Sequence, residues 1–214
     1  MAMSSKGLII TVEGIEGAGK STLARGLAAS VEKTGLSVVL TAEPGATPLG
    51  QAIRRLLLNP QCPPPVPMAE LMLFVADRAQ HVAEVIAPAL EAGKVVICDR
   101  FSDSSIAYQG AGRGLDNAWV KQVCERVSLG LNPQLTFLID LPVTEALRRA
   151  EGTDRIEREV VEFHERVRRG FLAIAKAEPE RVKLLDGTLN PSELLAQAWR
   201  FCQPIIEKCH ASGA

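Results

Sequence analysis

Five short runs of apolar and β-branched residues recur along the chain, and the segments between them carry apolar residues at helical spacing. Each run has four or five residues, the length of a strand buried in a sheet. The predicted strands are residues 8–12, 37–40, 94–98, 135–139 and 182–185. Strands that alternate with helices predict an α/β fold, a parallel five-stranded sheet with helices on both faces.

Suggestive residues follow the predicted strands where their carboxyl ends would meet, which is where such sheets bind ligands. They are a glycine-rich loop after the first strand, then Glu43-Pro44-Gly45, Asp99-Arg100, Asp140 and Asp186-Gly187. Residues 59–67 are rich in proline and are predicted to form a loop. The ligand site is therefore expected along one edge of the sheet.

The glycine-rich loop has the pattern G-x-x-x-x-G-K-[ST], with Gly14, Gly19, Lys20 and Ser21 at its fixed positions. The glycines let backbone N–H groups turn inward around phosphate, because no Cβ stands in the way. Lys20 would add a charge at the β- and γ-phosphates, and the Ser21 hydroxyl can ligate Mg²⁺. The helix predicted to follow favours an anion at its N-terminus. The pattern predicts a three-layer phosphate-loop NTPase fold that binds ATP through residues Gly14, Ile15, Glu16, Gly17, Ala18, Gly19, Lys20, Ser21 and Thr22.

A second charged strand end lies at Asp99, which closes the hydrophobic run 95–98. In phosphate-loop enzymes a carboxylate in such a position holds Mg²⁺ or its water. Arg100 follows directly, and its guanidinium is suited to two-point recognition of another phosphate group. The alternative for Arg100 is a surface salt bridge.

Two helical segments carry side chains suited to reading a nucleoside. Ser105, Tyr108 and Gln109 fall on one helical face, which offers a hydroxyl, a phenol and an amide. Phe74 and Arg78 stand four residues apart on an earlier helix, so that a stacking ring and a cation reach one pocket. Taken alone, a phenylalanine at position 74 is more often a core residue than a ring that stacks on a base.

Composition narrows the class of protein. With 214 residues, 47% of them hydrophobic, the chain can bury one core and is predicted to be a single domain over 1–214. The net charge of −1 shows no excess of positive charge that would favour binding to nucleic acid or to an acidic membrane. The five cysteines show no C-x-x-C spacing and no signal peptide precedes them, which predicts reduced thiols in a cytoplasmic protein.

Taken together, these motifs resemble the thymidylate kinase family, which phosphorylates dTMP to dTDP with ATP and Mg²⁺. The matching stretches are EGIEGAGKST, EPGATPLG, LMLFVADRAQH, CDRFSDSSIAYQGAGRG and DRIERE, in family order and over nearly the whole chain. The stretch from Asp99 to Gly110 is the most specific, because it separates this family from other nucleoside-monophosphate kinases. Transfer of the terminal phosphate, rather than hydrolysis or switching, is the expected reaction.

The resemblance implies roles at the phosphate end of the site. Lys20 would act on the transferred phosphate and Asp99 would join Ser21 at the metal. Arg54 and Arg100 would grip the dTMP phosphate, and Arg100 would also be catalytic. Glu16 would lie near the 3′-hydroxyl of the acceptor sugar and the metal.

At the base end the resemblance implies that Phe74 stacks on thymine. Arg78, Ser105 and Gln109 would hydrogen-bond the edge of the base. Tyr108 would crowd the position of a ribose 2′-hydroxyl and so favour deoxyribose. A hydrogen-bonded pocket of this kind discriminates well, because a wrong base leaves buried polar groups unpaired.

The phosphate loop lacks the arginine found there in one branch of the family. In the other, bacterial-type branch, lid arginines close over the phosphates, and residues 148–158 resemble that lid. Arg149 and Arg155 are the expected catalytic pair, and Gly152 would let the lid fold over and exclude water. The segment departs from the family in being slightly short, and Ala42 stands where an arginine is common. The family also implies a homodimer.

Three alternatives remain on sequence alone. Another nucleoside-monophosphate or deoxynucleoside kinase would share the fold, and only the base-reading residues argue against it. A nucleotide-dependent switch is disfavoured because the chain has no N-K-x-D segment for reading guanine. A homologue that has lost catalysis is disfavoured because Lys20, Asp99 and Arg100 are all present.

Overall fold

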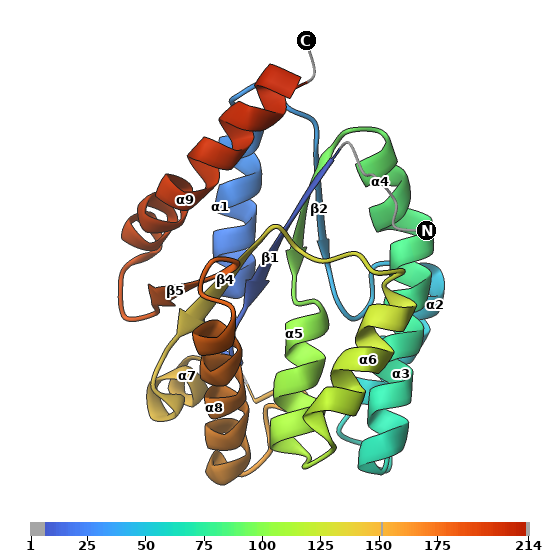
Figure 1. The fold of residues 1–214 in the computed structure, drawn as a ribbon. Helices are drawn as coiled ribbons and strands as arrows, with labels where there is room; N and C mark the ends of the chain where they lie inside the picture. The colour runs from blue at the N-terminus through green and yellow to red at the C-terminus, as the bar shows by residue number, and fades with distance from the viewer. Residues whose placement is uncertain (1–6, 151, 213–214) are drawn as a thin grey trace.

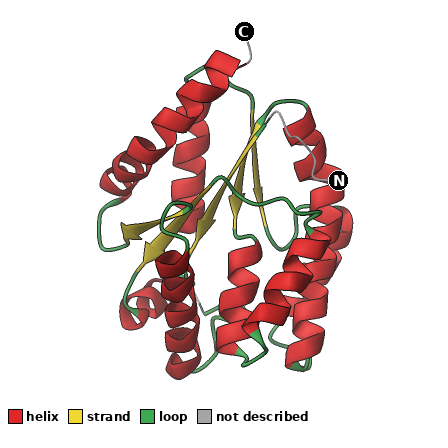
Figure 2. Ribbon diagram, viewed as in Figure 1, coloured by secondary structure: helices red, strands yellow, loops and turns green. Residues whose placement is uncertain are grey.

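The computed structural model describes residues 7–150 and 152–212 of the chain (Figure 1). A single sheet runs through its centre, with helices packed on either side (Figure 2). The strands are β1 (Leu8–Glu13), β2 (Val38–Ala42), β3 (Val95–Asp99), β4 (Leu135–Asp140) and β5 (Val182–Asp186). All of them are parallel, in the order β2-β3-β1-β4-β5. The predicted fold class is confirmed, with two of the strands beginning one residue later than predicted.

The helical elements fill the intervals between the strands. They are α1 (Lys20–Glu32), α2 (Pro48–Leu58), α3 (Pro67–His81), the π-helical η1 (Val82–Ile86), α4 (Ala87–Glu91), α5 (Ser102–Ser105), the π-helical η2 (Ile106–Gly112), α6 (Asn117–Val127), α7 (Val143–Arg149), α8 (Val161–Ala177) and α9 (Pro191–Ser212). The proline-rich connector is a loop up to Val66, and Pro67 then occupies the first turn of α3, where no intrahelical N–H is needed.

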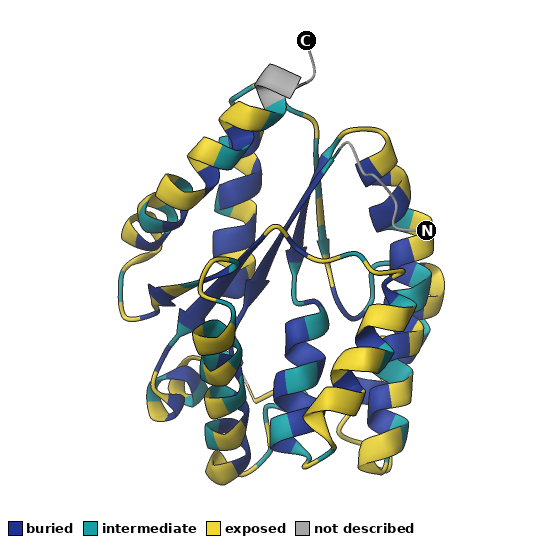
Figure 3. Cartoon of the chain, viewed as in Figure 1, coloured by how far each residue is buried: buried dark blue, intermediate teal, exposed yellow. Residues whose placement is uncertain are grey.

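Alternate side chains of β1 and β3 pack into two separate parts of the core. Leu8, Ile10 and Val12 of β1 pack against α1 and α9 on one face of the sheet. Ile9 and Val96 face the other way, against η1 and α4. β1, β3 and β4 are buried along almost their whole length, which is why they read as continuous apolar runs (Figure 3).

Parallel pairing sets the carboxyl ends of the central strands side by side. Val12 pairs with Asp99, and the phosphate loop leaves the end of β1 at the same edge. This edge is where α1, α5 and the loop after β2 begin, so residues far apart in sequence meet there. No helix in the described part of the chain is long and apolar enough to cross a membrane.

Candidate active site

The loop between β1 and α1 adopts backbone conformations that its glycines permit. Gly14, Gly17 and Gly19 all have positive φ, of 142°, 72° and 93°. A Cβ on Gly17 would collide with the carbonyl oxygen of Ala146 in α7. The loop therefore packs closely against α7 at this glycine.

Lys20 and Ser21 open α1 and face the end of β3. The Lys20 ammonium is buried and donates to the Ile15 carbonyl at 2.7 Å. The pKa of Lys20 is lowered to about 8, mainly because the ammonium is buried and secondly because the positive charge of Arg100 lies nearby. The Ser21 hydroxyl donates to Oδ2 of Asp99 at 2.5 Å.

Asp99 has a second oxygen that suits a cation. Its Oδ1 is buried and has no hydrogen-bond partner among the described residues. The described residues include no cluster of three or more His, Cys, Asp or Glu side chains arranged for a metal. Mg²⁺ in nucleotide sites commonly uses one or two protein ligands and takes the rest from phosphates and water. Ser21 and Asp99 together therefore fit such an ion.

Arg100 is aimed back at the phosphate loop. Its guanidinium donates to the Gly14 carbonyl at 3.0 Å, to Ser104 Oγ at 3.2 Å and to Glu16 Oε1 at 2.9 Å. It also lies 5.0 Å from the centre of the Tyr108 ring. The backbone of Arg100 is left-handed, with φ of 71°, a strained conformation for a residue with a Cβ and one often found at functional sites.

Glu16 joins the loop to the helices beyond it. Its Oε1 accepts from Arg100 and from the Tyr108 hydroxyl, the latter at 2.6 Å, and its Oε2 lies 3.4 Å from Nδ1 of buried His164. Burial alone would raise the pKa of Glu16, but Arg100, His164 and Lys20 lower it to about 2. Glu16 is therefore a carboxylate at neutral pH.

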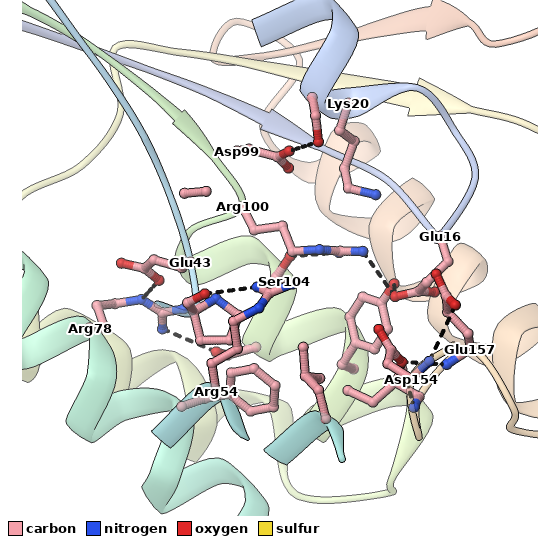
Figure 4. A pocket seen from close by; sticks show the side chains of 18 of the residues that line it. Glu16, Lys20, Glu43, Arg54, Arg78, Asp99, Arg100, Ser104, Asp154 and Glu157 are labelled. Atoms are coloured by element: carbon pink, nitrogen blue, oxygen red, sulfur yellow. Dashed lines mark hydrogen bonds and ion pairs between the residues drawn. The ribbon is translucent and has the colours of Figure 1, made fainter. Parts of the chain in front are cut away.

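These groups line a cavity of about 330 Å³ at the edge of the sheet (Figure 4). All eight residues expected at the acceptor site line it: Glu16, Arg54, Phe74, Arg78, Arg100, Ser105, Tyr108 and Gln109. Lys20, Ser21 and Asp99 line it as well, so the cavity adjoins the phosphate loop. Its volume is within the range of pockets that enclose a small molecule.

The residues expected to read the base are held by hydrogen-bond partners that the sequence did not reveal. Arg78, whose side chain is only 2% exposed, donates to Glu43 Oε2 at 2.8 Å, to Ser105 Oγ and the Phe101 carbonyl at 3.0 Å, and to Cys124 Sγ. Glu43 is held in turn by His81, at 3.0 Å. These contacts use four of the five N–H groups of Arg78, and the second N–H of Nη2 has no hydrogen-bond partner among the described residues.

Ser105, Tyr108 and Gln109 are helical as predicted, but the helix changes register between them. It becomes a π-helix at Ile106, and the Arg113 N–H bonds to the Tyr108 carbonyl five residues before it. Such π segments are frequent at functional sites. All three side chains still line the same cavity.

The segment 148–158, expected to be a lid, contributes Asp154, Ile156 and Glu157 to the cavity, and none of its arginines lines that cavity. Arg149 bonds to Glu145 and to the Gly187 carbonyl. Arg155 donates to the Leu57 carbonyl at 2.9 Å and to Glu70 Oε2 at 2.7 Å. In this arrangement neither arginine lines the cavity. The lid range also includes residue 151, which is outside the described part of the chain.

Sequence reasoning missed the buried glutamates around the site. Glu13 accepts from the Phe101 N–H at 2.7 Å and from Ser104 Oγ at 2.6 Å, and Glu70 binds Gln109, Arg113 and Arg155. A glutamate within an apolar stretch, as Glu13 is at the end of β1, was the available signal. Its partners could not be known without the fold.

Comparison with known proteins places the chain in a family. The family model for thymidylate kinase matches residues 12–198. A thymidylate kinase from a Synechococcus species is 47% identical over 197 residues, which cover 92% of this chain and 95% of that protein. Another, from Deinococcus radiodurans, is 48% identical over 198 residues, which cover 91% of this chain and 96% of that one.

A solved structure agrees with these relatives in fold. The crystal structure of thymidylate kinase from Ehrlichia chaffeensis superposes with a TM-score of 0.75 at 34% identity, over 91% of this chain and 97% of that one. Since the family model and the relatives span nearly the whole chain, the protein belongs to the thymidylate kinase family and phosphorylates dTMP to dTDP with ATP.

Proposed function

We propose that dTMP lies in the 330 Å³ cavity with its phosphate toward Arg54 and Arg100 and its base toward Phe74, Arg78 and Gln109. The single observation that carries this proposal is that every residue expected at the acceptor site lines one cavity that adjoins the phosphate loop. The loop itself would hold the ATP phosphates with its backbone N–H groups and Lys20.

The reaction that fits this arrangement is direct transfer. An anionic oxygen of the dTMP phosphate attacks the γ-phosphorus of ATP in line, so neither a covalent enzyme intermediate nor a catalytic base is needed. The protein contributes position and positive charge, from Lys20 and Arg100. The Tyr108 hydroxyl is fixed on Glu16 at 2.6 Å, which would hold the ring where it can exclude a ribose 2′-hydroxyl.

Ser21 and Asp99 would hold Mg²⁺ in the working enzyme. The support is the buried Asp99 oxygen without a hydrogen-bond partner beside the Ser21 hydroxyl. When bound, the ion neutralises charge on the nucleotide phosphates. The protein's share is to keep these two oxygens facing the phosphate loop.

We further propose that the lid is of the bacterial type, with Arg149 and Arg155 as its catalytic arginines. The phosphate loop has no arginine of its own, so cationic charge on the transferred group must come from elsewhere. Arg155 is bonded to Glu70 and Leu57 in the present arrangement, so its role requires the lid to move. Gly152, with φ of 65°, lies between α7 and α8 and would permit this motion.

A homodimer is proposed on the basis of exposed apolar side chains on adjacent helices. Leu49 and Leu56 of α2, Met68 and Met72 of α3, and Trp119 of α6 are each more than a third exposed. α3 packs against both α2 and α6, and the three helices lie on the same side of the molecule (Figure 1). Large exposed apolar surfaces mark interaction sites. A sedimentation mass of a single chain at micromolar concentration would contradict the dimer.

A cytoplasmic location is proposed from the free thiols of all five cysteines.

The test of the acceptor site is a panel of phosphate acceptors. ADP release from ATP is measured with dTMP, dUMP, dCMP, dGMP, AMP, UMP and thymidine offered singly, with Mg²⁺ and again with EDTA. Strong turnover with dTMP, weak turnover with dUMP and almost none with the others, all abolished by EDTA, is the expected result. Comparable turnover with dCMP or UMP would contradict the assigned base and sugar contacts.

A further inference from the structure

Glu70 is a carboxylate of α3 that accepts hydrogen bonds from three side chains, and its own side chain is only 1% exposed. Its Oε1 accepts from Gln109 Nε2 at 2.9 Å and from Arg113 Nε at 3.0 Å. Its Oε2 accepts from Arg113 Nη2 at 3.1 Å and from Arg155 Nη2 at 2.7 Å. Glu70 does not line the cavity, so any effect on the substrate must pass through one of these partners.

The surroundings of Glu70 keep it ionised. Burial on its own would raise the pKa of Glu70, but the bonds from Arg113, Gln109 and Arg155 lower it below its ordinary value. An ionised carboxylate has no proton to donate and can only accept hydrogen bonds. Every group that contacts Glu70 must therefore present a donor to it.

This requirement fixes the amide of Gln109. The two ends of an amide have nearly the same shape, and their assignment depends on hydrogen-bond partners. Because Glu70 only accepts, the NH₂ group of Gln109 must face it, and the carbonyl Oε1 is turned away from it. Gln109 lines the cavity, and Oε1, the only acceptor of its amide, is left to meet an N–H donor of a base there.

A fixed carbonyl selects bases that bring an N–H donor. Thymine and uracil carry a protonated N3 beside an O4 acceptor, whereas cytosine has an unprotonated N3 beside an amino group. The remaining N–H of Arg78 can donate to O4 of thymine or uracil, and Oε1 of Gln109 can accept from their N3–H. Cytosine would set its amino group against the N–H of Arg78 and its unprotonated N3 against Oε1 of Gln109. We propose that Glu70 is a positioning residue: it holds the amide of Gln109 in one orientation and so makes the site selective for thymine and uracil, which carry an N3–H, over cytosine. The inference rests on the proposed contact between Gln109 and the base.

The orientation of the Gln109 amide does not depend on the position of the lid. Arg155 bonds to Oε2 of Glu70, while Gln109 bonds to Oε1. Arg113 holds both oxygens and is itself paired with Glu159 at 2.6 Å. If Arg155 leaves Glu70 during catalysis, Arg113 still keeps the carboxylate charged and in place.

The experiment is a double-mutant cycle with Glu70→Gln and Gln109→Leu, read as the ratio of kcat/KM for dTMP to that for dCMP. A neutral amide at position 70 can donate or accept, so Gln109 is free to turn over. Glu70→Gln should lower the ratio about tenfold or more, mainly through KM for dTMP, because a mismatched buried polar pair costs that much. In the Gln109→Leu background the same change should alter the ratio less than about twofold, since the two effects share one interaction.

Glu159→Gln is the matched control. It removes a carboxylate that pairs with the same Arg113 but does not contact Gln109, so the ratio should stay at the wild-type value. If Gln109→Leu lowers the ratio and a folded Glu70→Gln protein does not, the role of Glu70 is overturned. If Gln109→Leu leaves the ratio unchanged, the base contact of Gln109 fails, and the inference fails with it.

Should Glu70→Gln not fold, the wild-type enzyme still gives a test. 5-Methyl-dCMP has nearly the same size as dTMP and the same ring methyl group, but it carries an unprotonated N3 beside an amino group. Its dissociation constant should exceed that of dTMP by about tenfold or more, because Oε1 of Gln109 would face an acceptor in place of the N3–H donor. Equal binding of the two nucleotides would overturn the proposed orientation of the amide.

Discussion

Replacement of Arg100 by alanine should impair the use of dTMP as the acceptor while leaving the binding of ATP almost unchanged. The guanidinium lies in the cavity, near both the phosphate loop and the nucleoside residues, and its side chain is 17% exposed, so a ligand can reach it. Arginine and alanine both carry a Cβ, so the left-handed φ of 71° is equally strained in the two proteins. The change therefore removes the guanidinium without adding backbone strain.

The magnitude follows from the contacts that the guanidinium can offer. One hydrogen bond from an arginine to a charged phosphate contributes about 1.5–3 kcal/mol, which corresponds to roughly a 10- to 150-fold loss in kcat/KM for dTMP. Glu16 would lose its 2.9 Å partner at the same time, and with it one of the charges that lower its pKa. The loss should thus fall at the upper end of that range.

The assay combines steady-state kinetics with calorimetric titration of ATP into the Arg100→Ala protein. Arg100→Lys is the control, because it keeps the charge but cannot form the two-point contact. We expect kcat/KM for dTMP to fall while the dissociation constant of ATP changes by less than about threefold, because the loop N–H groups are untouched. An equal loss of dTMP and ATP binding would show that Arg100 serves the phosphate loop through the Gly14 carbonyl rather than the acceptor.

Three further predictions can be tested on the same protein. Arg155→Ala should lower kcat more than it raises KM for dTMP, since its charge would act on the transition state, and an unchanged kcat would assign that role to another arginine of the lid. Gly17→Ala should weaken ATP binding in a titration, because its φ of 72° and the nearby Ala146 carbonyl leave no room for a Cβ. Burial and the nearby Asp103 raise the pKa of Glu13 from 4.5 to about 8, so the folded state holds this proton more tightly than the unfolded chain. Its contribution to stability is complete below about pH 4.5 and is lost as the pH rises through about 8, so melts over that range should show wild type losing stability relative to Glu13→Gln.

The sheet and the phosphate loop could be predicted because their signals are local. β1, β3 and β4 are buried on both faces, so each is an unbroken apolar run in the sequence. The phosphate loop depends on glycines at fixed spacing, and the structure gives three of them the positive φ that only glycine adopts easily.

The supports of the site could not be predicted because they join distant positions. Glu70 lies 39 residues from Gln109 and 85 from Arg155, and Glu43 lies 35 from Arg78. A lone glutamate in a helix usually indicates a solvated face, and nothing in the sequence says that Glu70 is buried. The π-helical turn after Ser105 was also hidden, because its residues fit an ordinary helix as well.

The buried carboxylates suggest how the site can be specific for a small, polar ligand. A flexible arginine or glutamine would have to be ordered when dTMP binds, and that ordering would reduce affinity. Here Glu43 holds Arg78 and Glu70 holds Gln109, so the donors and acceptors are oriented before any ligand arrives. If these groups contact the base as proposed, a wrong base would meet side chains that cannot turn to accommodate it, and the full energetic cost of the mismatch would reduce its binding. Selectivity for the base would therefore depend as much on these carboxylates outside the direct contacts as on the side chains that touch the nucleotide.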